Sequence, residues 1–254
     1  MNFRILQTSD LDEFQLVRQF LKQGADTSPV SGAEPDFVLV MKGFGGEFAE
    51  ETVREIKREL PITPILTILG SWCEGEARTG VPLNGVHNVM WYDFLSMAPL
   101  EFQAAALGFP TVWALPEGAW PDAMETLAQR RDRVLLPERE RRPCRMWIET
   151  DDFEQFRLLR DVFRTCFETE VFGRFAGCQP ADLGASDFLV CDFPDFTPAT
   201  QARFLELRTR FPAACSLAFL EFPRAHEWRW IHEHGGMKVF PKPFRIQDLQ
   251  YFLK

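Results

Sequence analysis

An internal repeat constrains this chain more than any other feature of its sequence. Residues 6–21, LQTSDLDEFQLVRQFL, return as residues 148–163, IETDDFEQFRLLRDVF. The identical pairs share one offset of 142 residues (150 minus 8) and are Thr8 with Thr150, Asp10 with Asp152, Phe14 with Phe156, Leu16 with Leu158, and Arg18 with Arg160. A repeat of this kind sets the architecture of a chain. The sequence therefore predicts two copies of one small domain.

Each copy begins with the same series of elements. A short apolar segment, residues 3–6 or 145–148, leads into an acidic turn and then into a helical pattern. Apolar side chains recur there at three- and four-residue steps, at Leu11, Phe14, Val17 and Leu21, and at Phe153, Phe156, Leu159 and Phe163. This spacing is typical of an amphipathic helix. Asp10 and Asp152 precede these helices at the position of an N-cap residue.

The rest of each copy alternates between apolar strands and helices. The predicted segments are strands 36–41, 65–69 and 86–91 with a helix at 46–60, and strands 187–192, 216–220 and 237–240 with helices at about 198–211 and 246–253. Continuous apolar strands that alternate with amphipathic helices indicate a parallel sheet covered on both faces. Residues 167–175 show a further strand pattern, and residues 22–35 show none. We expect two doubly wound α/β domains, the first of which lacks an edge strand.

The segment between the copies has a different composition. Residues 104–143 contain five prolines, Trp113, Trp120 and an arginine-rich stretch. Proline and mixed charge disfavour regular structure, so we expect a linker with one short helix near residues 122–131. Exposed tryptophan is unfavourable, and Trp113 and Trp120 are expected to dock against a domain. The predicted organisation is a domain at 1–103, a linker at 104–143 and a domain at 144–254.

Composition excludes several classes of function. The 254 residues are 46% hydrophobic and 26% charged, as in a globular protein, and the net charge is −9. This charge argues against a general nucleic-acid or membrane surface. No apolar run approaches the roughly 18 residues of a membrane span. The six cysteines form no CxxC pair, which predicts a reduced, cytoplasmic protein without disulfides.

Three motifs follow one another in the second copy. An acidic pair, Asp151-Asp152, follows the first strand, Asp192 ends the strand DFLVCD, and Lys242-Pro243-Phe244 follows the last strand. In order and spacing they resemble the receiver domain of two-component response regulators, which has a flavodoxin-like fold. The resemblance covers residues 145–254 and, more faintly, residues 3–103. It implies that Asp192 is a phosphoacceptor, that Asp151, Asp152 and Asp192 bind Mg²⁺, and that Lys242 contacts the phosphoryl group.

The chemistry of these residue types agrees with that implication. Carboxylates at the carboxyl ends of neighbouring parallel strands converge at the sheet edge where such folds bind ligands. Mg²⁺ prefers oxygen ligands, and a carboxylate can attack a phosphoryl group to form an acyl phosphate. Lysine supplies a point charge for phosphoryl oxygens.

Both copies also depart from the receiver pattern. In the second copy, Leu220 and then Glu221 stand where the family has a serine or threonine, and Val239 replaces an aromatic residue. An alternative interpretation therefore holds for the second copy: Lys242 pairs with Asp192, Asp152 caps a helix, and no phosphorylation occurs. In the first copy, Met41 stands at the acceptor position, Leu69 at the hydroxyl position and Tyr92 at the lysine position, and only Asp10 beside Ser9 remains of the acidic pair. We expect no phosphorylation there.

Other candidate sites have weaker patterns. Cys73 follows a predicted strand and could act as a nucleophile with His87 as its base, or bind a metal together with Glu74, Glu76 and His87. The neighbouring glutamates would raise the pKa of the Cys73 thiol, which favours an ordinary loop.

Two further segments also carry weak patterns. His226, His232 and His234 lie on one predicted helix, and we expect them to face water while Trp228 or Trp230 and Ile231 pack inward. The Gly-rich turn at residues 42–46 could receive an anion at a helix N-terminus, although such turns more often only connect a strand to a helix.

The sequence thus favours a non-enzymatic signalling or scaffolding protein with tandem pseudo-receiver domains that acts through protein contacts. The expected partner is a histidine kinase, a phosphotransfer protein or a downstream regulator, and a homo-oligomer is a further possibility. By the resemblance, the face at about residues 224–254 and its counterpart in the first copy are candidates for pairing. The alternative is a response regulator that accepts phosphate at Asp192 with Mg²⁺, and a third class is a small enzyme that uses the Cys73 loop.

Overall fold

The computed structural model describes most of the chain. The described residues are 2–7, 10–24, 34–48, 50–75, 83, 85–115, 132, 134–136, 143–177 and 186–253. The chain divides into two compact units, Met1–Leu135 and Leu136–Lys254. The predicted domains at 1–103 and 144–254 fall one in each unit. The bounds of the predicted linker stay a prediction, because many of its residues, including Trp120 and the helix expected at 122–131, lie outside the described ones.

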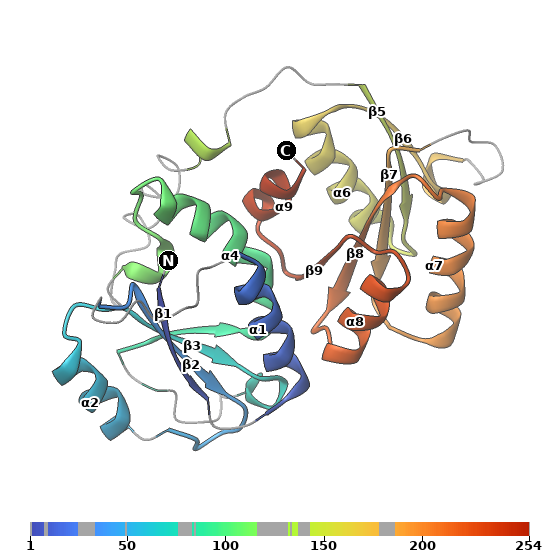
Figure 1. Cartoon of the computed structure of the whole chain (residues 1–254). Coiled ribbons are helices and arrows are strands. Elements are labelled where there is room, and N and C mark those ends of the chain that lie inside the picture. Colours follow the sequence, from blue (N-terminus) through green and yellow to red (C-terminus); the bar gives the residue numbers. More distant parts are fainter. Residues whose placement is uncertain are drawn as a thin grey trace. The chain divides into compact units, whose positions relative to one another are not determined.

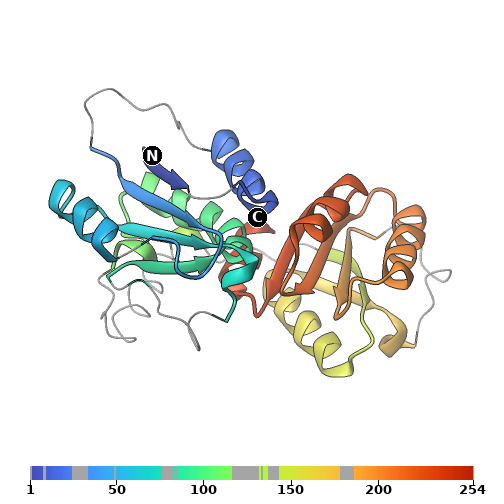
Figure 2. The same ribbon diagram turned by 90° about the horizontal axis from the view of Figure 1, so that it is seen from below.

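The first unit is built on a four-stranded parallel sheet (Figure 1). Its elements are β1 (Phe3–Gln7), α1 (Asp12–Gly24), β2 (Phe37–Lys42), α2 (Glu50–Glu59), β3 (Ile65–Leu69), η1 (Ser71–Cys73), β4 (His87–Met90), α4 (Trp91–Ala106) and η2 (Val112–Ala114). The strand order is β1-β2-β3-β4. Helices α1 and α4 cover one face of this sheet and α2 covers the other (Figures 1 and 2).

The second unit is built on a five-stranded parallel sheet. Its elements are β5 (Pro143–Glu149), α6 (Phe153–Cys166), β6 (Glu168–Phe172), η3 (Arg174–Ala176), β7 (Phe188–Phe193), α7 (Pro198–Arg210), β8 (Cys215–Glu221), α8 (Ala225–Glu233), β9 (Lys238–Lys242) and α9 (Ile246–Phe252). The order β6-β5-β7-β8-β9 places the first strand between the second and the third. This is the strand order of flavodoxin-like folds. The chain thus forms two flavodoxin-like doubly wound domains in tandem, as predicted.

The first domain has the smaller sheet, four strands against five, in agreement with the predicted lack of an edge strand. Its sheet has no counterpart of β6 among the described residues, so β1 lies at the edge. Between β3 and β4, where the second domain has α8, the described residues contain only the short η1.

The central strands of both sheets are buried on both faces. In the second domain, Phe188 and Val190 of β7 and Leu217 and Phe219 of β8 pack in one core with α6 and α9. In the first domain, Val38 and Val40 of β2 pack instead with α2. Because side chains alternate along a strand, Phe37, Leu39 and Met41 face the α1 and α4 side. Met41 therefore occupies the position that corresponds to Asp192, as the sequence predicted.

One hydrogen bond occurs in the same form in both domains. The Asp36 carboxylate accepts the backbone N–H of Asn2 at 2.7 Å, and the Asp187 carboxylate accepts that of Arg145 at 2.8 Å. Asp36 immediately precedes β2 and accepts the N–H just before β1. Asp187 immediately precedes β7 and accepts an N–H near the start of β5. The repeat is thus visible in side-chain contacts as well as in the order of elements.

Trp113 docks on the first domain. It is 4% exposed, and its ring lies 5.5 Å from that of Phe94 and 6.1 Å from that of Phe102, both in α4. A third neighbour is Phe37, at 6.4 Å. The expected docking of this tryptophan is therefore confirmed. No helix in the described part of the chain is long and apolar enough to cross a membrane.

Candidate functional site

Asp192 lies at the carboxyl end of β7, the middle strand of the second sheet, and its side chain is 3% exposed. Both of its carboxylate oxygens have a partner. Oδ1 accepts a hydrogen bond from Nζ of Lys242 at 2.8 Å, and Oδ2 accepts one from Oγ1 of Thr150, also at 2.8 Å. These partners come from the ends of β9 and β5. The structure therefore brings Asp192 and Lys242 together, as expected, and adds Thr150, which the sequence showed only as a member of the repeat.

Lys242 is held by two carboxylates. Its Nζ lies 2.8 Å from Asp192 and 3.2 Å from Oε1 of Glu221, and its side chain is 13% exposed. Burial alone would lower the pKa of Lys242, but the hydrogen bonds and negative charges of Asp192 and Glu221 outweigh burial and raise it. Lys242 is therefore a full cation at neutral pH. The peptide bond from Lys242 to Pro243 is cis.

The acidic pair does not converge on Asp192. Asp152 is the N-cap of α6, and its Oδ1 accepts the backbone N–H groups of Glu154 at 2.7 Å and Gln155 at 3.0 Å. Asp151 forms a close ion pair with Arg174 of η3, and its side chain is 75% exposed. Arg174 is a residue that sequence analysis missed, because nothing in the pattern of the chain places η3 beside this turn.

The fit to Mg²⁺ is poor. A magnesium site needs several oxygen ligands directed at one point. Here Asp192 is held by Lys242 and Thr150, Asp152 by backbone groups and Asp151 by Arg174. Among the described residues, no group of three or more histidine, cysteine, aspartate or glutamate side chains is placed to hold a metal ion. Mg²⁺ binding by Asp151, Asp152 and Asp192 therefore remains a prediction from the family resemblance.

The hydroxyl position of the receiver pattern falls on Glu221 in the structure. In the pairing of β8 with β9, Glu221 stands opposite Lys242 and Leu220 opposite Pro241. Since Phe219 shares the core on the Asp192 side of the sheet, alternation places Glu221 and not Leu220 on that side. The assignment from sequence was thus off by one residue. A carboxylate stands where the family has a hydroxyl, and Val239, at the position of the usual aromatic, is fully buried.

The same edge of the first domain has none of these charged groups. Pairing between β3 and β4 sets Leu69 opposite Met90, which brings Gly70 and Trp91 to the positions of Glu221 and Lys242. The sequence had placed Leu69 and Tyr92 there. Trp91 is fully buried, and its Nε1 donates to Oγ of Ser71 at 3.1 Å. Asp10 pairs with Arg18 at 2.5 Å, while Thr8 and Ser9 lie outside the described residues.

The Cys73 loop has a structural explanation. Cys73 is 2% exposed, and its Sγ contacts the backbone oxygen of Lys42 at 3.7 Å. A ring nitrogen of His87 makes a close hydrogen bond to the backbone oxygen of Leu115. Glu76 lies outside the described residues. The described contacts thus use Cys73 and His87 separately, and none joins them as a nucleophile and its base.

The three histidines of the α8 region also behave as expected. His226, His232 and His234 are exposed, whereas Trp228 and Ile231 are buried. Nδ1 of His232 bonds the backbone oxygen of Gly236 at 2.9 Å, and Nδ1 of His234 bonds that of Trp230 at 2.7 Å. These contacts end a helix and do not gather around a common point.

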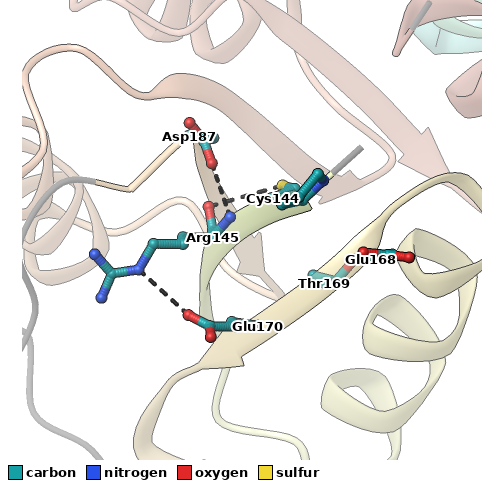
Figure 3. A pocket seen from close by; sticks show the side chains of 7 residues that line it. Cys144, Arg145, Glu168, Thr169, Glu170 and Asp187 are labelled. Atoms are coloured by element: carbon teal, nitrogen blue, oxygen red, sulfur yellow. Dashed lines mark hydrogen bonds and ion pairs between the residues drawn. The ribbon is translucent and has the colours of Figure 1, made fainter. Parts of the chain in front are cut away.

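A hollow of about 610 Å³ lies at the opposite edge of the second sheet, where β5 and β6 begin (Figure 3). Its labelled side chains include Glu168, Glu170 and Asp187, with Arg145 among them (Figure 3). Arg145 lies 3.5 Å from Glu170 through Nε and donates its backbone N–H to Asp187. Arg145 and Glu170 thus form an ion pair, although Nε of Arg145 makes no hydrogen bond within the described residues, and Asp187 binds the strand end, which indicates a structural role.

Comparison with known proteins yields likenesses of fold at low identity. No family model matches the chain, and no curated protein matches it either. A protein assigned to pilus assembly from Burkholderia pseudomallei is 16% identical over 43% of this chain and 86% of its own, with a TM-score of 0.38. A protein assigned as a response regulator from Chloroflexus aurantiacus is 22% identical over 44% of this chain and 95% of its own, with a TM-score of 0.36. A protein assigned as a two-component response regulator with a GGDEF domain is 13% identical over 99% of this chain and 96% of its own, with a TM-score of 0.37.

Proposed function

We propose that this chain is a non-enzymatic signalling or scaffolding protein, in which two receiver-like domains act through protein–protein contacts. One observation supports this above all. The carboxylate at the acceptor position, Asp192, is buried with both oxygens occupied, and Glu221 stands beside it where the family has a hydroxyl. The second domain keeps the receiver framework while its central carboxylate acts in the packing of the strand ends.

Electrostatics disfavours phosphorylation at this position. A phosphoryl group on Asp192 would bring a charge of about −1.5 to −2 next to Glu221. Two like charges about 4 Å apart repel by roughly 4 kcal/mol at an effective dielectric constant of 20. Lys242 is the cation at hand, and it is already shared between Asp192 and Glu221. The phosphorylated state therefore lacks the balancing charge that it needs.

Intact-mass spectrometry tests this proposal directly. The full chain is incubated with acetyl phosphate and Mg²⁺, and its mass is compared with that of Asp192→Asn treated in the same way. We expect neither protein to gain a phosphate. A phosphate on the wild type that is absent from Asp192→Asn would overturn the non-enzymatic, unphosphorylated interpretation.

The alternative function is a phospho-accepting response regulator modified at Asp192. The observation in its favour is the 2.8 Å contact between Lys242 and Asp192, which brings together the two receiver residues that the sequence predicted. In that case a histidine kinase or a phosphotransfer protein would be the partner, and Mg²⁺ would be required. The mass gain described above would then depend on Mg²⁺ and be lost in EDTA.

Engineering the missing hydroxyl separates the two functions further. In Glu221→Thr, the repelling carboxylate is replaced by the hydroxyl that the receiver pattern has at this position. If the proposal holds, this variant should accept more phosphate from acetyl phosphate than the wild type. Equal labelling of the wild type and Glu221→Thr would show that Glu221 does not determine reactivity.

A further inference from the structure

Two aromatic side chains lie exposed at the carboxyl edge of the first sheet. Phe44 follows β2 and is 42% exposed, and Trp72 lies in η1 after β3 and is 75% exposed. Their rings stack with centroids 6.3 Å apart and an interplanar angle of 27°. A single exposed apolar residue is ordinary, but a stacked pair with a largely exposed tryptophan is the kind of surface that partners cover.

Hydrogen bonds to the backbone hold both loops in place. Oε2 of Glu47 accepts the N–H groups of Gly43 at 2.8 Å and Phe44 at 3.2 Å. Oε1 of Glu13, which is 8% exposed, accepts the N–H of Ser71 at 3.0 Å. The N–H of Gly70 donates to the backbone oxygen of Lys42 at 2.8 Å and so joins the two loops. A pair that is held before binding loses little conformational entropy when a partner arrives.

The surroundings of this pair are acidic. Within the described residues of the two loops, 43–48 and 70–75, the charged side chains are those of Glu47 and Glu74. The side chain of the preceding Lys42 is 1% exposed and so presents no cation at the surface. Arg54 pairs with Glu50 and Glu51 on α2. The surface at Phe44 and Trp72 therefore combines exposed aromatic rings with the nearby carboxylates of Glu47 and Glu74.

At the positions that carry the ionic contact in the second domain, the first domain has uncharged residues. Where the second domain has Asp192, Glu221 and Lys242, the first has Met41, Gly70 and Trp91, and the two loops beyond them present Phe44 and Trp72. Tryptophan is among the residues that contribute most to protein interfaces, and its ring attracts the cationic groups of arginine and lysine. The aromatic rings and the nearby carboxylates thus both favour a partner that presents a cationic side chain.

We propose that Phe44 and Trp72 form a docking surface for a segment of a partner protein that presents an arginine or lysine next to an aliphatic side chain. The aliphatic group would cover the exposed rings, and the cation would lie over the indole or beside Glu74. This inference rests on the proposed function, because it names the surface through which the chain makes its protein contacts. It concerns the first domain alone and does not involve Asp192.

Fluorine NMR of the intact chain labelled with 5-fluorotryptophan tests the surface. The probe is the peptide Ac-Gly-Arg-Leu-Arg-Gly-NH₂, and the control peptide has glutamate in place of both arginines. The Trp72 resonance is assigned from its absence in Trp72→Phe. We expect the basic peptide to shift this resonance in a saturable manner, and the acidic peptide to leave it unchanged.

Variants define the expected pattern. Trp72→Ala lacks the reporter resonance, so its binding of the basic peptide is followed by isothermal titration calorimetry. It should bind about tenfold more weakly than the wild type, since such contacts are worth roughly 1–2 kcal/mol. Glu74→Lys should weaken binding several-fold by removing an attractive charge. Ile62→Ala is the matched control, because Ile62 is 85% exposed in the same domain, at the opposite edge of the sheet, and its loss should not affect binding. Circular dichroism spectra like that of the wild type would show that each variant is folded.

Three results would overturn the proposal. They are the absence of a Trp72 shift with the basic peptide, an equal shift with the acidic peptide, and a Trp72 shift that appears with protein concentration alone. The last result would assign the surface to a second copy of this chain. None of them bears on the phosphate content of Asp192, so failure here is distinguishable from failure of the proposed function, which the intact mass reports.

Discussion

Asp192 has the structural role of a buried ion-pair partner, whatever its reactivity. Its carboxylate satisfies Lys242 on one side and Thr150 on the other, and all three side chains are largely removed from water. Removing one member of a buried pair leaves the other charge buried without its partner. The resulting loss of stability exceeds the net stability that the intact pair contributes.

Asp192→Ala should therefore destabilise the protein by about 3 kcal/mol. The reason is that Lys242 would keep only the half-exposed Glu221 as a counterion, and Thr150 would lose its acceptor. Urea unfolding followed by circular dichroism measures the change. Glu206→Ala is the control, because Glu206 is 65% exposed and pairs only at the surface with Arg203. Unchanged or increased stability in Asp192→Ala would show that the acid is retained at a cost, as a reactive group would be.

Lys238 should make stability depend on pH in a defined window. Burial lowers the pKa of Lys238 to about 8, and the negative charge of Asp248 offsets part of that effect. The folded protein therefore binds fewer protons than the unfolded chain, whose lysine has a pKa near 10.4. Stability then rises as the pH increases from about 8 to 10, and below pH 8 the folded state bears the unfavourable buried cation.

Lys238→Met should remove this dependence. Near pH 7 the variant is expected to be more stable than the wild type by about 1 kcal/mol, a value that allows for the partial exposure of Lys238. The difference between the two proteins should shrink as the pH approaches 10. Thermal unfolding at pH 7 and pH 10 measures it. The raised pKa of Lys242 acts only at higher pH and in the opposite direction, so it does not contribute within this window. A constant difference between the proteins would contradict the assignment.

At the scale of the element, helix α6 depends on the residue that precedes it. Asp152 accepts two backbone N–H groups of the first turn. Asp152→Ala should lower stability by about 1 kcal/mol, whereas Asp152→Ser, which keeps a capping oxygen, should lose much less. Thermal unfolding distinguishes the two variants. Equal losses in both would indicate that the carboxylate, and not the cap, is what the position requires.

The order of elements could be predicted from sequence because it depends on local patterns. The repeat, the amphipathic helices and the Asp152 cap all lie within short segments, and the missing edge strand followed from the absence of an apolar run. Which residues of each strand face which side of the sheet could not be predicted in the same way. Strands buried on both faces are continuously apolar, so alternation does not mark which residue faces which side. This explains why Leu220 and Tyr92 were assigned where Glu221 and Trp91 stand.

The contacts of the candidate site were harder to predict than its residues. Asp192 and Lys242 could be paired from the resemblance, but Arg174 beside Asp151 and Thr150 beside Asp192 depend on how a turn and a strand end are oriented in three dimensions. The stacking of Phe44 on Trp72 is similar, because the two residues belong to different loops that only the sheet brings together.

At the scale of the whole molecule, each unit has its own core. Phe94 is fully buried among the aromatic residues of the first domain, and Phe219 is fully buried among those of the second. We expect the intact chain to unfold in two calorimetric transitions. Phe94→Ala should destabilise the domain of only one transition, and Phe219→Ala that of only the other. In each case the unfolding free energy of the affected domain should fall by about 3–5 kcal/mol. A single transition lowered equally by both variants would show that the domains unfold as one unit.

The contact among Thr150, Asp192 and Lys242 also has a consequence for kinetics. Asp192 is separated along the chain by 42 residues from Thr150 and by 50 from Lys242, so the contact closes only when β5, β7 and β9 are already side by side. Loop-closure entropy must be paid before contacts of such long sequence separation form, and we expect this one to close after the rate-limiting step of folding. An interaction that is absent from the transition state slows unfolding and leaves the folding rate nearly unchanged. The buried carboxylate would thus lengthen the lifetime of the native domain, a benefit that is independent of any signal passing through it.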